Sequence, residues 1–95
     1  MLSVVVPVLN EADNIRPLVG EIHAALEGRL EYEIIYVDDG SEDESPQILA
    51  ALMAEEPRLR VIQHAQRCGQ SAGMRTGAQH AQFNWIVTLD GDGQN

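Results

Sequence analysis

Two aspartates separated by one glycine follow the last apolar run of the chain. Residues 85–89 read WIVTL, and Asp90, Gly91 and Asp92 come directly after them. A β-branched, apolar run of this kind is typical of a strand buried on both faces of a parallel sheet. Carboxylates do not pack at the end of such a strand, but their oxygens bind hard divalent cations, which commonly bridge a protein to phosphate. The pair therefore predicts a metal and phosphate site.

Three other apolar runs also end in polar clusters. These clusters read LNE at 9–11, DDGS at 38–41 and RCG at 67–69. Ligands of open parallel sheets bind at the carboxyl ends of the strands, so the four clusters should converge there. If the first strand lies between the second and the fourth, the ends of those two are about 10 Å apart, twice the strand spacing. That is the reach of a nucleoside with its first phosphates, so Glu11 and Asp39 are candidate acceptors for base N–H groups and sugar hydroxyls.

Each cluster also has a simpler interpretation. Residues 38–41 could form only a turn, since Asp, Gly and Ser favour turns. Glu11 could be a solvated acid in the first turn of a helix. Arg67 could be a surface charge, although it is the cation nearest to the predicted phosphate site, and a nucleophilic role for Cys68 is weakly supported. The histidines have no ligand spacing and are interpreted as structural or surface residues: His23, His64 and His80.

Alternating patterns predict the elements that position these clusters. Strands are expected at residues 2–8, 32–37, 59–63 and 85–89, with a helix in each interval between them. The order βαβαβαβ with short connections predicts an α/β fold: a three-layer parallel sheet with right-handed crossovers.

Helix-capping residues, prolines and glycines predict where the helices begin and end. Asp13 or Asn14 should cap the first helix, because Pro17 is tolerated only in a first turn or as a kink, and Gly28 should end it. Ser45 should cap the second, with Pro46 at its first helical position. The third is expected at 71–81. Three small residues fall four apart there and would let the helix approach the sheet closely: Gly69, Gly73 and Gly77.

Length and charge limit the class of protein. The chain has 95 residues, of which 44% are apolar, so one small domain is expected. Its net charge of −9 makes nucleic acid and anionic membrane surfaces poor partners, and it would repel a phosphorylated ligand unless a cation intervened. The single cysteine forms no internal disulfide, and no signal peptide or membrane-spanning run is visible. These features favour a cytoplasmic location.

Four segments together resemble family 2 glycosyltransferases of the GT-A fold, with dolichol- or polyprenyl-phosphate sugar transferases as the nearest branch. They read VVVPVLNE at 4–11, VDDGS at 37–41, GQSAG at 69–73 and TLDGDGQN at 88–95. Their order and spacing match the family over essentially the whole chain. The resemblance implies that residues 1–95 form the amino-terminal, nucleotide-sugar-binding half of a GT-A domain and are a fragment of a longer enzyme.

The resemblance also implies roles for individual residues. Asp90, Gly91 and Asp92 match the family's D-x-D motif, and Asp92 would be the principal ligand of Mg²⁺ or Mn²⁺ and the catalytic residue, with Gln94 close by. The positions matching the nucleotide pocket are Pro7, Leu9 and Glu11 at the base and ribose, Val37 and Asp39 at the base, and Arg67 near the phosphates.

The implied reaction is inverting transfer from a nucleoside-diphosphate sugar to a polyprenyl or dolichyl phosphate, or to another glycan acceptor. The acceptor site, any general base and any membrane helices would lie after Asn95, so the isolated segment should be inactive. The full-length protein is expected at the cytoplasmic face of a membrane. A sheet that stops after its fourth strand leaves an edge under-covered, which favours a homo-oligomer.

Three alternatives compete with this interpretation. A non-catalytic nucleotide-binding module remains open. A phospho-acceptor signalling domain is disfavoured, because its acidic pair follows the first strand and it uses a lysine, whereas this chain has its pair after the second strand and has no lysine. A dinucleotide oxidoreductase is disfavoured because no G-x-G-x-x-G follows the first strand.

Overall fold

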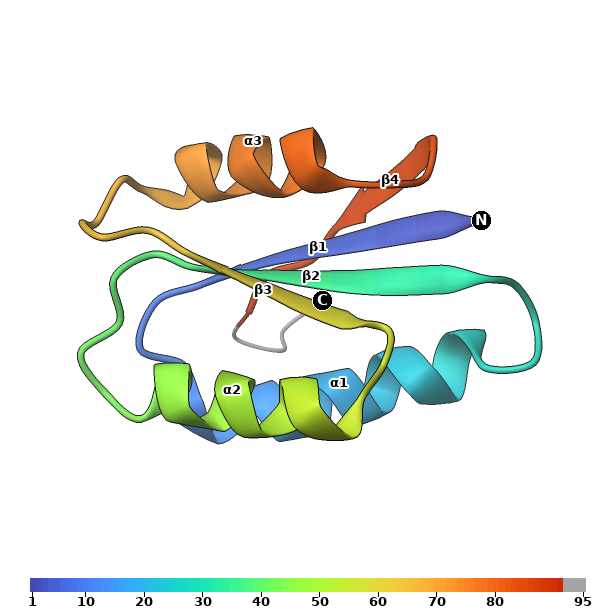
Figure 1. The fold of residues 1–95 in the computed structure, drawn as a ribbon, viewed down its shortest axis with the longest axis horizontal. Helices are drawn as coiled ribbons and strands as arrows, with labels where there is room; N and C mark the ends of the chain where they lie inside the picture. The colour runs from blue at the N-terminus through green and yellow to red at the C-terminus, as the bar shows by residue number, and fades with distance from the viewer. Residues whose placement is uncertain (92–95) are drawn as a thin grey trace.

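Strands and helices alternate along the described part of the chain, as the sequence predicts (Figure 1). The computed structural model describes residues 1–91. The elements are β1 (Leu2–Val8), α1 (Ala12–Leu26), β2 (Tyr32–Asp38), α2 (Ser45–Glu55), β3 (Leu59–Gln63), α3 (Gln70–His80) and β4 (Trp85–Thr88). No helix among the described residues is both long and apolar enough to cross a bilayer.

The four strands form one parallel sheet in the order β3-β2-β1-β4. Val4 of β1 pairs with Ile34 on one side and with Val87 on the other. Strand β1 therefore lies between β2 and β4, the order that the predicted spacing of the acidic clusters requires.

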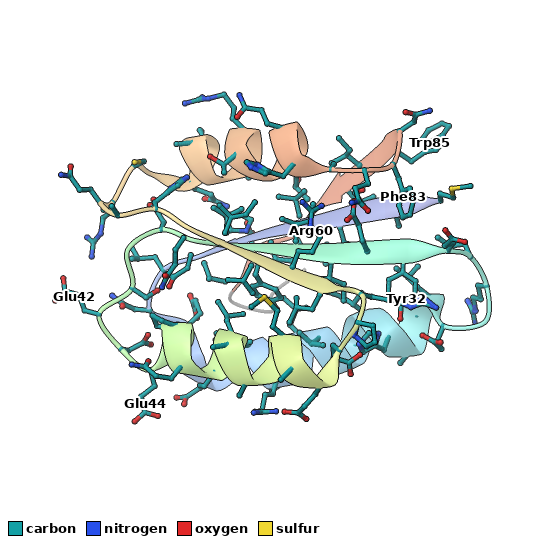
Figure 2. The ribbon with its side chains drawn as sticks, in the orientation of Figure 1. Tyr32, Glu42, Glu44, Arg60, Phe83 and Trp85 are labelled. Carbon is teal, nitrogen blue, oxygen red and sulfur yellow. The ribbon has the colours of Figure 1, made fainter. Side chains whose placement is uncertain are left out.

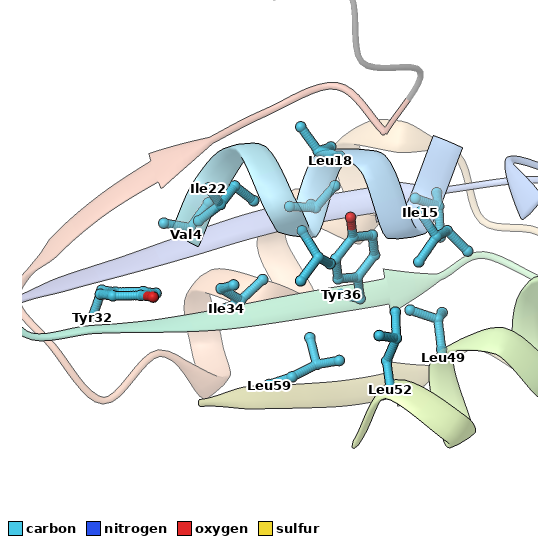
Figure 3. Close-up of a cluster of buried hydrophobic side chains, with 13 residues drawn as sticks. Val4, Ile15, Leu18, Ile22, Tyr32, Ile34, Tyr36, Leu49, Leu52 and Leu59 are labelled. Atoms are coloured by element: carbon cyan, nitrogen blue, oxygen red, sulfur yellow. The ribbon is translucent and has the colours of Figure 1, made fainter. Parts of the chain in front are cut away.

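The sheet is the middle of three layers. Helices α1 and α2 cover one face and α3 covers the other (Figure 1). The main core lies between the sheet and the α1–α2 layer, where alternate residues of β1 and β2 meet the apolar stripes of the helices (Figure 3). Each such side chain contributes about 1.5–3 kcal/mol through its burial. The most buried members are Val6, Ile15, Ile34, Tyr36 and Leu49.

Helix α3 packs against the sheet through two glycines. A Cβ on Gly77 would lie 2.2 Å from Val5 Cγ1, and one on Gly73 would lie 2.9 Å from the Cβ of Pro7. The predicted close approach is therefore confirmed at both positions. It is wrong for Gly69, where an added Cβ would meet nothing within 4 Å. Gly69 instead precedes the helix with φ +97°, a conformation that glycine adopts at little cost.

We expect Gly77→Ala to destabilise the protein by about 1–2 kcal/mol, because overpacking against the buried Val5 outweighs the better helix propensity of alanine. The matched control is Gly20→Ala in α1, where nothing lies within 4 Å of the added Cβ. That variant should gain up to about 1 kcal/mol. Urea denaturation of both variants measures the difference, and equal stabilities would contradict the close-packing argument.

The predicted helix starts are partly wrong. Helix α1 begins at Ala12, so Asp13 and Asn14 lie in its first turn and Pro17 lies inside the helix. The N–H of its first residue is bonded to a distant segment of the chain: Ala12 donates to Asp43 Oδ2 at 3.1 Å. Helix α2 begins at Ser45 itself, with Glu44 at the cap position. At α1 a tertiary hydrogen bond has replaced the local cap that the sequence pattern suggested, whereas the Ser45 N–H at the start of α2 is bonded locally, to Asp43 Oδ1 at 2.8 Å.

Strand β4 is not buried on both faces, contrary to the prediction. All four of its residues are exposed, Trp85 to 75% (Figure 2). Within the described part of the chain β4 is an edge strand that pairs with β1 alone, and α3 packs over β1 and β2. An apolar run indicates a strand but does not say whether the strand is interior or at an edge.

The buried carboxylate of Glu33 joins neighbouring strands by hydrogen bonds at the amino-terminal end of the sheet. Glu33 Oε2 accepts hydrogen bonds from the Ser3 hydroxyl and the Gln82 N–H, both at 2.6 Å, and Oε1 accepts one from Arg60 at 3.0 Å. These contacts join three strands to the segment that leads into β4; Figure 2 labels Arg60 and Phe83 in this region. Burial raises the pKa of the Glu33 carboxyl, but the three hydrogen bonds together hold it below its ordinary value.

Candidate functional site

A pocket of about 350 Å³ opens at the carboxyl ends of the strands. All four polar clusters contribute to it, which confirms the predicted convergence. Glu11 follows β1, Asp39 follows β2, Arg67 precedes α3 and Asp90 follows β4. The complete lining is Pro7, Val8, Leu9, Glu11, Asp39, Arg67, Gly69, Gln70, Asp90 and Gly91.

Asn10 ties the first two loops of the pocket together. It adopts φ 55°, a left-handed conformation that asparagine tolerates better than most residues. Its Oδ1 accepts hydrogen bonds from the N–H groups of Glu42 at 2.8 Å and Asp43 at 3.3 Å, and its own N–H donates to Ser41 Oγ at 2.9 Å. The loop that carries Glu11 is therefore fixed against the loop that follows β2.

Asp38, which ends β2, and Asp39, which follows it, have different roles. Asp38 is fully buried and its Oδ1 accepts the Ser41 N–H at 3.0 Å, so it shapes the turn, as the simpler interpretation of this cluster proposed. Asp39 lines the pocket, and it also accepts hydrogen bonds from the N–H groups of Cys68 and Gly69, each at 2.8 Å. Asp39 thus connects the loop after β2 to the loop before α3.

His64 is the other partner of Asp39. Its Nδ1 lies 2.8 Å from Asp39 Oδ1, and its Nε2 lies 2.8 Å from the Thr76 hydroxyl on α3. Burial raises the pKa of the Asp39 carboxyl, but the hydrogen bonds from His64 and the two backbone N–H groups outweigh it and leave that pKa below its ordinary value. Asp39 is therefore held as a carboxylate at neutral pH.

The far wall of the pocket is formed by Asp90 and Gly91. Gln70 donates from Nε2 to Asp90 Oδ1 at 2.7 Å, which joins the start of α3 to the end of β4. A Cβ on Gly91 would lie 2.3 Å from Val8 Cγ1 and 2.9 Å from the Pro7 carbonyl oxygen. The absence of a side chain there lets this wall approach the end of β1 closely.

Among the described residues, one predicted site residue, Val37, is not part of the pocket lining. Val37 is fully buried in the sheet, where its Cγ1 faces Gly73 of α3. Asp92 and Gln94 lie outside the described residues. A nucleotide contact by Val37 would have to pass through its backbone or through its support of Pro7.

The charges around the pocket favour a cation. Three carboxylates line it, those of Glu11, Asp39 and Asp90, against one guanidinium, that of Arg67. The amino terminus of α3 adds a favourable partial charge for an anion, since Gly69 and Gln70 form part of the wall. An oxygen-only donor set with excess negative charge fits a hard divalent ion at Asp90, and such an ion would let a phosphate group enter.

The sequence interpretation missed several residues that build this site. The sequence pattern predicts a structural or surface position for His64 and assigns no role to Thr76 or Gln70. For His64 the only available signal was its place directly after a predicted strand, because its partners come from two other segments of the chain. The signal for Gln70 is its place as the first residue of the helix that follows the Arg67 loop.

Comparison with known proteins gives one family. The model of glycosyl transferase family 2 matches residues 3–95. Undecaprenyl-phosphate 4-deoxy-4-formamido-L-arabinose transferase of Pseudomonas fluorescens is 39% identical over 97 residues, covering 99% of this chain and 28% of that protein. Dolichyl-phosphate beta-glucosyltransferase ALG5C of Trichomonas vaginalis is 33% identical over 94% of this chain and 28% of its own length.

A solved structure agrees with these sequence relatives. The mannosyltransferase PcManGT from Pyrobaculum calidifontis, in complex with GDP-Man and Mn²⁺, superposes with a TM-score of 0.86 at 27% identity. The match covers 96% of this chain and 27% of that one. The chain thus spans less than a third of the length of the proteins it matches.

Proposed function

The chain belongs to glycosyl transferase family 2, and on that premise we propose that it supplies the nucleotide and metal site of an inverting glycosyltransferase. The predicted GT-A fold and the likeness to polyprenyl-phosphate sugar transferases are confirmed. The observation that carries the proposal is that Glu11, Asp39 and Asp90 line the same pocket. These three carboxylates come from the ends of three strands, at the place where an α/β sheet binds its ligand.

Different residues of this chain contact different parts of the nucleotide-sugar donor. Asp39 and Glu11 accept hydrogen bonds from base N–H groups and ribose hydroxyls, and Pro7 and Leu9 supply an apolar wall beside them. Arg67 and the amino terminus of α3 face the diphosphate. They position the bond between the sugar and the phosphate so that an acceptor oxygen attacks from the opposite side, which inverts the configuration.

Asp90 and Asp92 would hold Mg²⁺ or Mn²⁺, and of these Asp90 is described and lines the pocket. When bound, such an ion stabilises the negative charge that develops on the leaving diphosphate. The acidic surroundings make this contribution necessary, because a net charge of −9 opposes the entry of a pyrophosphate.

The proposed acceptor is a polyprenyl or dolichyl phosphate, or another glycan acceptor. A lipid phosphate is already an anion, so its attack needs no strong general base. The likeness to undecaprenyl- and dolichyl-phosphate transferases supports this choice. We place the acceptor site downstream of residues 1–95 and the full-length protein at the cytoplasmic face of a membrane.

The proposal is tested by titrating the protein with UDP- and GDP-sugars while recording backbone amide shifts. With Mg²⁺ present, shifts should appear at Asp39, Gln70 and Asp90, and Mn²⁺ should broaden the signals around Asp90 by its paramagnetism. Little change is expected without a divalent ion. Shifts confined to the opposite end of the sheet, around Glu33 and Gln82, would contradict the proposal.

An isolated segment of residues 1–95 should bind nucleotide weakly and transfer no sugar, because it carries only the donor half of the proposed site. Sugar transfer to a polyprenyl phosphate, measured on the segment and on the full-length gene product under the same conditions, checks this. Turnover by the segment would contradict the division of the site. If the full-length product binds nucleotide sugar but transfers nothing, the alternative of a non-catalytic nucleotide-binding module is favoured instead.

A further inference from the structure

Three potential metal ligands of different chemistry meet beside the pocket. Asp39 follows β2, His64 follows β3 and Cys68 precedes α3, and one ligand atom from each lies within 4.8 Å of the others. We propose that this Asp39–His64–Cys68 cluster is a second cation site, which takes a thiophilic divalent ion such as Zn²⁺ and thereby blocks the nucleotide pocket.

The carboxylate and the imidazole are already oriented as ligands. Asp39 Oδ2 accepts the Gly69 N–H at 2.8 Å, and Oδ1 points toward His64 Nδ1 at 2.8 Å. The other ring nitrogen of His64 lies 2.8 Å from Thr76 Oγ1. A metal-binding histidine needs such a partner on its second nitrogen, because that partner fixes the tautomer and the ring orientation.

The proton balance of binding is simple. Without the ion, His64 Nδ1 donates to Asp39 Oδ1, because an ionised carboxylate can only accept, and the Thr76 hydroxyl lies against Nε2. With the ion on Nδ1, the ring proton lies on Nε2 and is donated to Thr76 Oγ1, whose hydroxyl serves either arrangement. The Cys68 thiol loses its proton to solvent, so a dication with one carboxylate and one thiolate makes a neutral site.

The donor set separates this cluster from the pair at Asp90 and Asp92. Sulfur and imidazole nitrogen favour Zn²⁺, which accepts three protein ligands and keeps a fourth position for water, whereas oxygen-only sites favour Mg²⁺ and Mn²⁺. Two classes of cation would therefore bind here, one inside the pocket at Asp90 and one beside it at Asp39. Cys68 is exposed, which gives the ion a route into the site, and the net charge of −9 attracts cations generally.

Blocking follows from the position of Asp39, which belongs both to the cluster and to the pocket wall. An ion on Asp39 takes the carboxylate that the proposed function gives to the nucleotide base and ribose. This consequence rests on the proposed function, whereas binding of the ion itself does not.

A calorimetric titration of the protein with Zn²⁺, which measures the affinity of the ion, tests the site. Cys68→Ser keeps the backbone N–H that Asp39 accepts, but it should weaken Zn²⁺ binding by ~100-fold or more, since a hydroxyl is a poor ligand at neutral pH. Thr76→Val should weaken it by about tenfold through the loss of the partner of His64. His80→Gln, which changes an exposed histidine outside the cluster, is the matched control and should bind Zn²⁺ unchanged.

Co²⁺ provides a signature that general loss of structure would not give. Co²⁺ in this site should produce the thiolate-to-metal charge-transfer absorption that Cys68→Ser lacks. Equal Zn²⁺ affinity in the Cys68→Ser variant, or the absence of that absorption, would overturn the proposed site.

The blocking effect is measured as nucleotide affinity at saturating Mn²⁺, with and without Zn²⁺. Zn²⁺ should lower the affinity of the unchanged protein and leave that of Cys68→Ser nearly unaffected. An equal loss in both proteins would place the inhibition at Asp90 and Asp92 and overturn the blocking claim. If neither protein binds nucleotide, the proposed function fails while the Zn²⁺ titration still decides the site.

Discussion

Asp90→Asn is expected to lower the rate of sugar transfer by the full-length enzyme by ~100-fold or more, because the leaving diphosphate loses the charge compensation that a bound cation gives. The substitution is nearly isosteric, and an asparagine oxygen can still accept the hydrogen bond that Gln70 donates to Asp90. The loss would therefore reflect charge rather than a collapsed wall. Asp92→Asn should act in the same direction.

The measurement is initial rate against Mn²⁺ concentration. A weakened ion site should shift the Mn²⁺ dependence to higher concentration and recover part of the rate there. The matched control is Glu44→Gln, which removes an exposed carboxylate outside the pocket (Figure 2). If that variant loses as much activity as Asp90→Asn, the effect comes from net charge and not from a ligand.

Glu33→Gln should reduce the free energy of unfolding by about 2–4 kcal/mol, since an amide has one acceptor oxygen where the buried carboxylate uses two. The Arg60 guanidinium would then face an NH₂ group or lose its partner. The matched control, Glu31→Gln, changes an exposed acid two residues earlier and should cost little. Urea denaturation at neutral pH measures both, and similar losses in the two variants would contradict the role of this network.

The Glu33 carboxyl should also make the free energy of unfolding depend on pH in the acid range. The pKa of Glu33 is lowered in the folded protein, so its stabilisation is complete above the unfolded value of about 4.3. That stabilisation is lost as the pH falls through the lower folded value, because the unfolded chain then binds the proton more readily. Glu33→Gln should lack this part of the acid sensitivity. A parallel loss of stability in both proteins between neutral pH and pH ~3.5 would contradict it.

The local sequence pattern was sufficient to predict the strands and helices. It was also sufficient to predict that the site residues meet at one edge of the sheet. The bounds of β1 and β3 follow from their apolar runs, and the remaining ends differ from the prediction by a few residues at most. The pocket could be predicted because a parallel sheet brings all carboxyl ends to one edge. For that reason Glu11, Asp39 and Asp90 could be grouped without knowledge of any contact between them.

Features that depend on contacts between distant segments could not be predicted. The start of α1 is fixed by Asp43, a residue that the local sequence around Ala12 does not contain. The roles of His64 and Thr76 arise only when β3 and α3 are packed beside Asp39. The exposure of β4 also depends on which strands are its neighbours, and an apolar run carries no information about that.

The position of β1 in the middle of the sheet also orders the events of biosynthesis. Leu2 pairs with Tyr32 on one side but with Trp85 on the other. On the ribosome, β1, β2 and β3 can assemble while one side of β1 is still unpaired, because its partner β4 is translated much later. Such long-range strand pairing is slow. We expect nascent chains to expose this strand, and to depend on chaperones, until residue 85 has left the exit tunnel.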